Sequence, residues 1–454
     1  MCKRSVALNM RVFTRRKICY IPNSKEVSMT KITLTEDQEA ARQEIIKASR
    51  KRGTYLLLGY AGTGKTTLMD TLASDFVKRG KSVVVTATTH KAVAVLKSKI
   101  TEYGVDCRTI HRLLSLRPYE DETGTQLIRS PGSPAVSVDV VIVDECSMVA
   151  ADVFAWIERL LPKSFVLFVG DDAQLPPVNE DKSLTFNTKR RSTLSRIVRQ
   201  AEGNPILQAA TFIRESQGGN ADWAWMGNKK NGKQGVFLVG DSDMWLRKAF
   251  TSDEFLHDKN SFRYLCWTND RVASVNKKVQ YWLYGDIPTP FAPGELVLSK
   301  RLYKSGRDEL QNNEETIVDG IREGTITAKW GKYGGEDFTI PVWFVLTSKG
   351  ITVPIVKDWR EYNAAYKWIR QNYTKIRPEE GEKPYYHVTA FRDMFGVLQS
   401  NYAMTVHSSQ GSTFKSVFVD TSDILKRQKT NLLECQQLFY VAITRASDMV
   451  FLVR

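Results

Sequence analysis

A phosphate-binding loop constrains this chain more than any other feature. Residues 59–66 read GYAGTGKT, which matches G-x-x-x-x-G-K-[ST], and they lie between an apolar run at 55–58 and a helix-like stretch that begins near Lys65. The pattern needs this context, because its glycines let backbone N–H groups curl around phosphate oxygens at a helix N-terminus. The chain is therefore expected to contain an α/β domain that binds a nucleoside triphosphate.

The side chains of the loop have separate expected roles. Lys65 would reach the β- and γ-phosphates, and the hydroxyl of Thr66 would ligate magnesium. The other predicted nucleotide contacts, within the loop or directly after it, are Gly59, Gly62, Thr63, Gly64 and Thr67. The expected cofactors are ATP and Mg²⁺.

Length and composition narrow the class of protein. At 454 residues the chain is long enough for two to four domains. It has no run of eighteen apolar residues and no secretory signal pattern, so we expect no membrane span and a cytoplasmic location. Six scattered cysteines without a C-x-x-C pair predict reduced thiols.

The net charge of +15 predicts a polyanionic partner, for which nucleic acid is the leading candidate. Part of this charge lies in residues 1–29, where Lys and Arg outnumber a single acidic residue, Glu26. We expect this segment to be either a disordered basic arm or the product of an upstream start codon, because Met29 opens a sequence typical of a domain start.

Strands and helices alternate after the loop. Apolar runs at 82–86, 140–143 and 165–169 predict buried parallel strands, and helices are expected at about 90–99 and 150–161. This pattern indicates a doubly wound α/β domain with its chemistry at the carboxyl ends of the strands.

A second α/β region is expected further along the chain. Its candidate strands are 264–267, 417–419 and 449–453, with a helix near 270–284. Short β-like pieces separated by Gly-rich turns, between about 291 and 395, predict a small barrel inserted into this region, with an aromatic-rich helix at 358–373.

An acidic pair ends the strand at 140–143. Asp144 would hold the metal and Glu145 would act as the general base that activates water. The alternative is an ordinary pair of surface carboxylates at a strand end.

The order of the motifs carries a family resemblance. Ten segments occur in sequence: LTEDQ, GYAGTGKT, ATTHKAVAVL, TIHRLL, VIVDECSM, VGDDAQLPPV, LSRIVRQ, CWTNDRVASVN, NYAMTVHSSQGSTF and LFYVAITRA. Together they cover almost all of 34–454, and the chain resembles superfamily 1B helicases of the RecD/Dda branch. The QLPPV continuation distinguishes this branch from the UvrD-like one.

The resemblance implies a fold. It predicts two RecA-like P-loop NTPase domains, with a β-hairpin pin insertion and an inserted SH3-like β-barrel domain that carries a helical tower. The expected boundaries are 30–190 for the first domain with the pin at about 115–135, 191–290 plus 396–454 for the second, and 291–395 for the insertion.

The resemblance also assigns residues to ATP turnover. Gln38 would read the adenine edge, unless it is only a surface glutamine on a helix. Gln174 would contact the γ-phosphate or its attacking water. Arg199 and Arg445 would reach the γ-phosphate from the second domain, the alternative for each being a solvated arginine.

Contacts to single-stranded DNA are implied for hydroxyl, amide and imidazole side chains, which suit phosphate, sugar and stacked bases. They are Thr88, Thr89, His90, Thr109, His111, Thr268, Asn269, Thr405 and His407. For some of the threonines, helix capping is an open alternative. The histidines show no metal-site spacing. The chain also departs from the family, because Ser408 stands after His407 where a basic residue is common.

The segment between TIHRLL and the strand at 140–143 has a turn-like centre at 122–125, which predicts a β-hairpin. By resemblance this hairpin is a strand-separation pin with candidate wedge residues Tyr119, Leu127 and Ile128. The alternative is a mobile surface loop.

The predicted function is ATP-dependent 5′-to-3′ DNA unwinding in phage DNA replication, recombination or repair. Expected partners are single-stranded DNA, duplex forks, a single-stranded-DNA-binding protein and replication machinery, with the chain acting as a monomer. Two alternatives share the motifs: a translocase that strips proteins from single strands, and an RNA-directed relative. A P-loop kinase for small molecules would not need the later motifs.

Overall fold

The computed structural model describes residues 33–102, 104–121, 124–198, 203–216, 228–240, 242–329, 336–376 and 385–454. The expected basic extension at 1–29 lies outside these ranges, and so does Arg199. The chain divides into two compact units, Met1–Leu34 and Thr35–Arg454, and the description below concerns the second.

The first sheet of this unit contains the strand that leads into the phosphate loop. Its six strands run in the order β3-β2-β6-β7-β1-β8, and all described pairings are parallel. The strands are β1 (Gly53–Gly59), β2 (Val83–Ala87), β3 (Asp106–Thr109), β6 (Val140–Val143), β7 (Phe165–Gly170) and β8 (Arg191–Leu194). Every residue of β2, β6 and β7 is buried, as expected for a parallel sheet covered on both faces.

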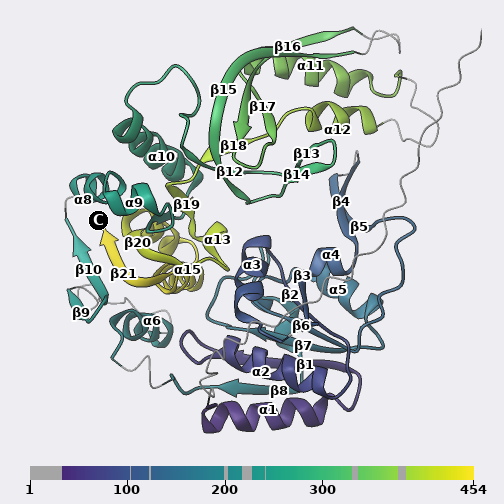
Figure 1. Ribbon diagram of the computed structural model, residues 1–454, viewed down its shortest axis with the longest axis vertical. Coiled ribbons are helices and arrows are strands. Elements are labelled where there is room, and N and C mark those ends of the chain that lie inside the picture. Colours follow the sequence, from purple (N-terminus) through teal and green to yellow (C-terminus); the bar gives the residue numbers. More distant parts are fainter. Residues whose placement is uncertain are drawn as a thin grey trace, which may run out of the picture. The chain divides into compact units, whose positions relative to one another are not determined.

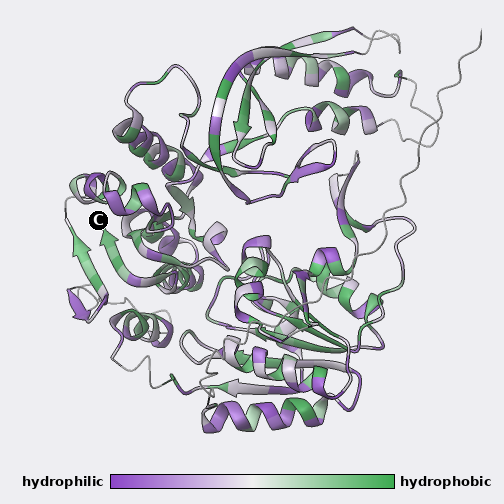
Figure 2. Cartoon of the chain, viewed as in Figure 1, coloured by the Kyte–Doolittle hydropathy of each residue, from purple (hydrophilic) through white to green (hydrophobic). Residues whose placement is uncertain are grey.

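Helices alternate with these strands (Figure 1). They are α1 (Glu36–Ala48), α2 (Lys65–Lys78), α3 (His90–Lys99), α4 (Ile110–Leu113) and α5 (Ala151–Leu160), with the 3₁₀ turns η1 (Cys146–Met148) and η2 (Leu184–Asn187). Helix α2 buries Leu68, Leu72 and Phe76, which repeat every four residues and so share one face. In Figure 2 the strands of this sheet are mostly hydrophobic, whereas α1 alternates between hydrophilic and hydrophobic residues.

A second, mostly parallel sheet has the order β19-β11-β20-β21-β10-β9, with β9 antiparallel at its edge. Its strands are β9 (Lys229–Asn231), β10 (Gln234–Val239), β11 (Phe262–Cys266), β19 (Ala403–Thr405), β20 (Phe414–Asp420) and β21 (Ala446–Val453). Its helices are α6 (Pro205–Glu215), α8 (Ser242–Phe250), α9 (Asp253–His257), α10 (Asn269–Tyr284), α13 (Val406–Ser409), α14 (Thr421–Leu425) and α15 (Leu432–Thr444), with the 3₁₀ turn η5 (Lys426–Lys429). The two expected α/β domains are therefore present as two separate sheets.

The inserted region forms an antiparallel sheet in the order β17-β16-β15-β12-β18. Its strands are β12 (Leu296–Ser299), β15 (Glu315–Ala328), β16 (Phe338–Thr347), β17 (Thr352–Val356) and β18 (Leu398–Ser400), accompanied by the small hairpin β13 (Tyr303–Ser305) and β14 (Asp308–Leu310). Helices α11 (Trp359–Asn372) and α12 (Tyr386–Asp393) pack against its strands through a shared apolar cluster. Closure into an SH3-like barrel stays a prediction.

Two strand pairings place domain boundaries differently from the sequence expectation. Strand β8 pairs with β1 from Leu56↔Arg191 to Gly59↔Leu194, so the first sheet continues beyond residue 190. Strand β18 pairs with β12, so 398–400 belong to the inserted sheet rather than to a second domain resuming at 396. Both strands lie at sheet edges and are short, and β8 is polar. Neither therefore has the apolar run from which a strand could be predicted.

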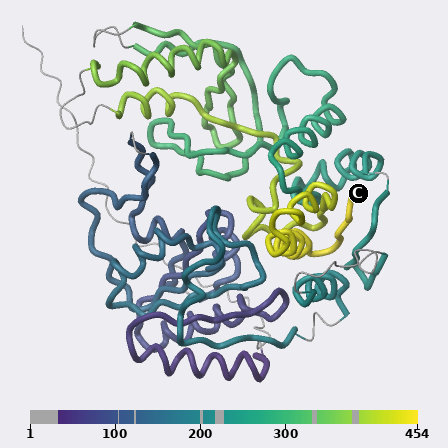
Figure 3. The backbone as a smooth tube through the Cα atoms, turned by 180° about the vertical axis from the view of Figure 1, so that it is seen from behind, coloured from purple at the N-terminus to yellow at the C-terminus, as the bar shows by residue number. Residues whose placement is uncertain are grey.

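The predicted hairpin is present. Strands β4 (Leu116–Asp121) and β5 (Gly124–Arg129) form a separate antiparallel pair, seen from behind in Figure 3. The turn residues 122 and 123 lie outside the described ranges.

Two findings concern membrane and redox expectations. Within the described ranges, the structure contains no helix with the length and apolar character needed to cross a bilayer. The four cysteines in those ranges are free and buried: Cys107, Cys146, Cys266 and Cys435.

Candidate nucleotide and nucleic-acid site

The phosphate loop links the end of β1 to the start of α2. Gly62 and Gly64 have φ values of 82° and 75°, a left-handed conformation that favours glycine. A Cβ at Gly64 would also come within 2.4 Å of Nε2 of Gln38. The hydroxyl of Thr63 donates to the carbonyl of Tyr60 at 2.8 Å, which closes the curl. The loop therefore has the backbone shape that exposes its N–H groups to an anion.

Lys65 is the first residue of α2, and its ammonium donates to the carbonyls of Gly59 and Tyr60. Its charge also lowers the pKa of Asp144 and of Asp171, although burial acts more strongly in the opposite direction on both. The structure therefore brings the loop lysine close to the ends of β6 and β7, where the sequence predicted the chemistry.

Asp144 and Glu145 follow β6 directly. Burial, and secondarily the charge of Glu145, raise the pKa of Asp144 to about 7. Glu145 has a φ of 51°, a left-handed conformation uncommon for a residue with a side chain, and it directly precedes η1. A buried carboxylate with a raised pKa is stabilised in its ionised form by a nearby cation.

A divalent cation would therefore fit beside Asp144. Among the described residues no group of three or more His, Cys, Asp and Glu side chains forms a metal cage. Mg²⁺ is commonly held by one or two protein oxygens together with substrate phosphates, so a site built from Thr66 and Asp144 agrees with this composition.

Gln38 is buried, with 4% of its surface exposed. Its Oε1 accepts from the N–H of Thr35 in a capping box at the start of α1, and its Nε2 donates to the carbonyl of Thr63 at 2.8 Å. The alternative of a solvated surface glutamine is therefore wrong. Gln38 contacts the phosphate loop itself, while adenine recognition stays a prediction.

Gln174 lies in the turn after β7. Its N–H donates to the carbonyl of Asp171 at 3.2 Å, and its Oε1 is buried without a hydrogen-bond partner among the described residues. A buried carbonyl oxygen in this state is uncommon and is available to a ligand.

Arg445 follows α15 and is only 7% exposed, so it is not a solvated arginine. Its guanidinium donates to the carbonyls of Val441 and Ser412 and to the hydroxyl of Thr444. These bonds all lie within the second α/β domain, so a contact of Arg445 with phosphate stays a prediction.

The predicted DNA contacts lie at the carboxyl ends of adjacent parallel strands in both sheets. In each sheet, a threonine caps the helix that follows such a strand, by accepting a hydrogen bond from a backbone N–H of the first turn. The four capping residues are Thr89 (α3), Thr109 (α4), Thr268 (α10) and Thr405 (α13).

Capping is thus observed for these four residues, and it does not exclude contact with phosphate, because the remaining N–H groups of a helix start attract anions. Thr88 differs, since its hydroxyl lies 3.7 Å from Sδ of Met148. Asn269 is the first residue of α10.

Of the three histidines of this set, His90 is exposed, and His111 and His407 are partly buried. Burial is the largest cause that lowers the pKa of His90, His111 and His407 below the ordinary 6.5. They are therefore neutral at pH 7.5 and suit stacking or hydrogen bonding rather than ion pairing. Ser408 accepts a hydrogen bond from Thr405 at 2.9 Å. Lys415, the next basic residue along the chain, is paired with Glu254.

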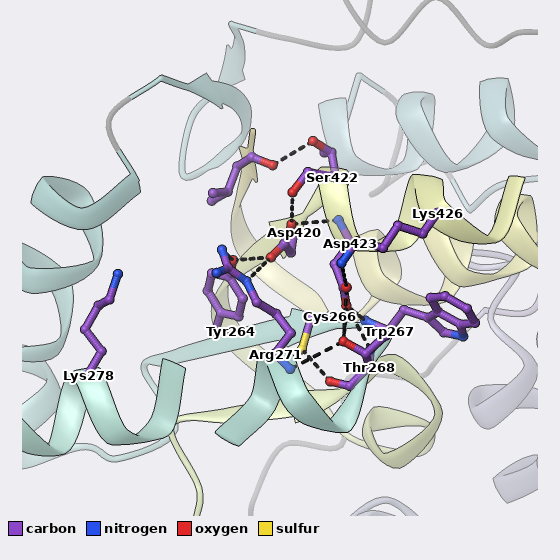
Figure 4. A network of polar contacts seen from close by, with 12 residues as sticks. Tyr264, Cys266, Trp267, Thr268, Arg271, Lys278, Asp420, Ser422, Asp423 and Lys426 are labelled. Carbon is purple, nitrogen blue, oxygen red and sulfur yellow. Dashed lines mark hydrogen bonds and ion pairs between the residues drawn. The ribbon is translucent and has the colours of Figure 1, made fainter. Parts of the chain in front are cut away.

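A buried carboxylate supports the Thr268 position (Figure 4). Asp423 accepts hydrogen bonds from the N–H groups of Trp267 and Thr268 and from the Thr268 hydroxyl, at 2.8 to 3.1 Å. Asp423 is 1% exposed and follows β20, far from Thr268 in the sequence. Sequence reasoning missed this supporting residue, whose position becomes apparent only when β11 and β20 pair.

Known proteins resemble the chain along most of its length. Residues 33–229 match the family described as AAA domain, and residues 401–453 match the UvrD-like helicase C-terminal domain. The ATP-dependent DNA helicase dda of Enterobacteria phage T4 is 24% identical over 94% of this chain and 100% of its own length. The ATP-dependent RecD2 DNA helicase of Deinococcus radiodurans is 26% identical over 87% of this chain and 46% of its own.

These matches support a helicase that is similar to the Dda, RecD and Pif1 helicases of superfamily 1B.

Solved helicase structures are also similar to the chain. A Pif1 structure from work on DNA unwinding at forked duplexes covers 92% of both chains at 19% identity with a TM-score of 0.49. Bacteroides Pif1 bound to single-stranded DNA gives 20% identity and a TM-score of 0.48, again over 92% of both chains.

The predicted wedge residues of this helicase lie on two faces of the hairpin. Tyr119 pairs with Gln126, and two residues along the ladder Arg117 pairs with Ile128. Since side chains alternate between the two faces, Tyr119 and Ile128 share one face. Leu127 is on the other face and packs against the apolar core of the first domain. The wedge role stays a prediction, and the packing of Leu127 makes Tyr119 and Ile128 the better candidates.

The same hairpin contacts the inserted domain. Glu120 of β4 forms an ion pair with Arg392 of α12, and both side chains are partly exposed. This contact joins residues 272 positions apart, so sequence spacing did not indicate it.

Proposed function

We propose that the chain is an ATP-dependent DNA helicase that moves 5′ to 3′ along single-stranded DNA and unwinds duplex forks. One observation carries the proposal: the phosphate loop of the first sheet contacts a helix of the second, through a hydrogen bond of 3.0 Å from the Ala61 N–H to the Tyr440 hydroxyl. A nucleotide bound at such a boundary can drive one domain against the other.

The first domain supplies the groups proposed for hydrolysis. Lys65 would exchange its loop carbonyls for β- and γ-phosphate oxygens, Glu145 would take a proton from the attacking water, and Gln174 would orient that water. Thr66 and Asp144 would hold Mg²⁺, which when bound neutralises developing phosphate charge.

The second domain would complete the site with Arg445 and Arg199. A guanidinium at the γ-phosphate is worth roughly 10³- to 10⁵-fold in turnover in comparable enzymes. Arg445 would have to release part of its present bonding to Val441 and Ser412 to reach phosphate, which links its role to a movement of the second domain.

The nucleic-acid groove would be formed by the threonine-capped helix starts of both domains. The net charge of +15 favours a polyanion, while neutral histidines and hydroxyl groups contact it without reading sequence. Closing and opening of the nucleotide site would then shift the grip of each domain in turn, as in an inchworm.

We further propose a monomeric protein of the cytoplasm, or of the infected host cell, that acts in replication, recombination or repair. Single-stranded-DNA-binding protein and replication machinery would be its partners. The description of the T4 relative as an ATP-dependent DNA helicase supports the DNA substrate.

The test is strand displacement on 5′-tailed and 3′-tailed duplexes of DNA and of RNA, with ATP. We expect displacement of the 5′-tailed DNA duplex alone. Displacement of tailed RNA would favour the RNA-directed relative. Streptavidin removal from biotinylated single strands without any displacement would favour the stripping translocase and contradict the proposal.

A further inference from the structure

Tyr440 of α15 bridges two motifs of the first domain. Its hydroxyl donates to Oδ2 of Asp171 at 2.6 Å and accepts from the N–H of Ala61 at 3.0 Å. Ala61 belongs to the phosphate loop, and Asp171 follows β7. The tyrosine is 2% exposed and Asp171 is 1% exposed, so water does not replace either bond readily.

Asp171 shapes the turn that carries Gln174. Its Oδ1 accepts from the N–H of Ala173 at 3.0 Å, and its carbonyl accepts from the N–H of Gln174 at 3.2 Å. Each oxygen of the Asp171 carboxylate thus has one partner, and one of the two comes from the second domain. Removing the tyrosine hydroxyl would leave a buried carboxylate oxygen and a loop N–H without partners.

Packing around this bridge holds the same turn against the second domain. Ala61, Ala173 and Leu175 contact the apolar core built on β20, β21 and α15. In addition, Nε2 of Gln410 donates to the carbonyl of Leu175 at 3.3 Å. The aromatic ring of Tyr440 therefore serves packing, whereas the hydrogen bonds of its hydroxyl to the described residues are those to the phosphate loop and Asp171.

We propose that the hydroxyl of Tyr440 is a positioning group for ATP turnover. It fixes the position of the Asp171–Gln174 turn relative to the phosphate loop when the two α/β domains are in contact. The inference rests on the proposed ATP hydrolysis and goes beyond it by naming the link from the second domain. Both bonds of the hydroxyl exist only when α15 lies against the loop. Domain contact and the position of Gln174 are thereby coupled.

The matched experiment compares Tyr440→Phe with Tyr264→Phe. Tyr264 is also fully buried and donates to a buried aspartate, Asp420, at 2.6 Å, but it lies wholly within the second domain (Figure 4). Both substitutions keep the ring and remove one hydroxyl next to a carboxylate. A difference between them in turnover therefore reports the position of Tyr440 and not the loss of a buried hydrogen bond.

We expect Tyr440→Phe to lower kcat of ATP hydrolysis, at saturating single-stranded DNA, roughly 10- to 100-fold, the range expected for losing a hydrogen bond to a charged group. KM for ATP should stay within about threefold, because Lys65 and the loop backbone still bind phosphate. Tyr264→Phe should keep kcat within about twofold. Equal kcat values for the two variants would overturn the proposal, and so would a rise in KM with kcat unchanged.

A second variant guards against failure of Tyr440→Phe to fold. Asp171→Asn should lower kcat by a similar factor, and the double variant should be no worse than the poorer single variant, since both remove one link. Fully additive losses would count against the link. A wild-type protein that hydrolyses ATP without unwinding would contradict the proposed helicase function while leaving this ATPase comparison valid.

Discussion

Because His407 is neutral, we can predict how its substitution affects the salt dependence of DNA binding. Burial is the largest cause that lowers its pKa, and Arg427 adds to the effect while Glu434 opposes it, so His407 carries no charge at pH 7.5. His407→Gln should weaken binding to single-stranded DNA without altering the slope of log K against log salt, because a neutral contact releases no counterion. Fluorescence anisotropy of a labelled oligonucleotide across a salt series measures this.

The neighbouring position provides the matched control. Ser408→Lys should tighten binding and steepen the slope by up to about 0.7, the value expected for one phosphate contact on a single strand. Only below the lowered pKa of His407 should the wild-type slope exceed that of His407→Gln. A reduced slope for His407→Gln at pH 7.5, or unchanged affinity for Ser408→Lys across the series, would contradict the assignment.

At the scale of an element, the β4–β5 hairpin can be tested as a pin. Replacing Tyr119 and Ile128 with alanine should depress unwinding while leaving DNA-stimulated ATP hydrolysis intact, because apolar side chains on one face would substitute for a stacked base pair at the fork. Displacement of a 5′-tailed duplex and phosphate release are measured side by side. Parallel loss of both activities would argue against a pin.

Leu127→Ala is the contrasting variant on the other face of this hairpin. Since Leu127 packs against the core of the first domain, its truncation should cost stability, on the order of 1–2 kcal/mol for a partly buried leucine. Unwinding and ATP hydrolysis should then fall together on heating. Loss of unwinding alone would indicate that Leu127 acts as a wedge residue.

Elements with apolar runs were predictable from the sequence, and polar elements at sheet edges were not. The runs at 140–143 and 165–169 became β6 and β7, and the helix expected at 90–99 is α3. Strand β8, with the sequence RSTL, shows no such run and exists because β1 offers it a free edge.

The candidate site also contains residues that were predictable from the sequence and contacts that were not. Lys65 and Asp144 were predictable from local motifs, because each belongs to a short segment that follows a strand and is recognisable from a few neighbouring residues. The contact of Tyr440 with Asp171 joins positions 269 residues apart, and no spacing rule anticipates it. The signal that could have suggested a role was the presence of Tyr440 inside the LFYVAITRA motif.

Across the whole molecule, Glu315 connects three parts of the chain. Its Oε1 lies 2.7 Å from Nζ of Lys91 on α3, 3.5 Å from Nη2 of Arg263 on β11 and 2.7 Å from Nδ2 of Asn401. Both cations also lie 4.8 Å from the ring centre of Phe414. One carboxylate of the inserted sheet thus balances cations from both α/β domains.

Removing that charge should destabilise the junction strongly. Arg263 is fully buried, so Glu315→Gln removes the carboxylate that pairs with both Arg263 and Lys91, at a cost of about 3–5 kcal/mol. Lys91→Met should cost less, since Glu315 keeps Arg263 and Asn401. Urea unfolding followed by fluorescence and circular dichroism measures both variants, and equal midpoints for wild type and Glu315→Gln would contradict the role of this junction.

The pH dependence supplies an independent check on Glu315. Burial raises the pKa of this carboxyl, but Arg263 and Lys91 outweigh that effect and bring it below the ordinary 4.5. Its stabilising contribution is therefore fully present above pH 4.5 and is lost as pH falls through the lowered pKa, because the folded protein must then bind a proton that the unfolded chain has already taken up. The difference in urea midpoint between wild type and Glu315→Gln should stay constant from pH 8 to pH 6 and shrink in acid. A difference that grew in acid would mean that Glu315 is protonated in the folded protein and does not balance the two cations.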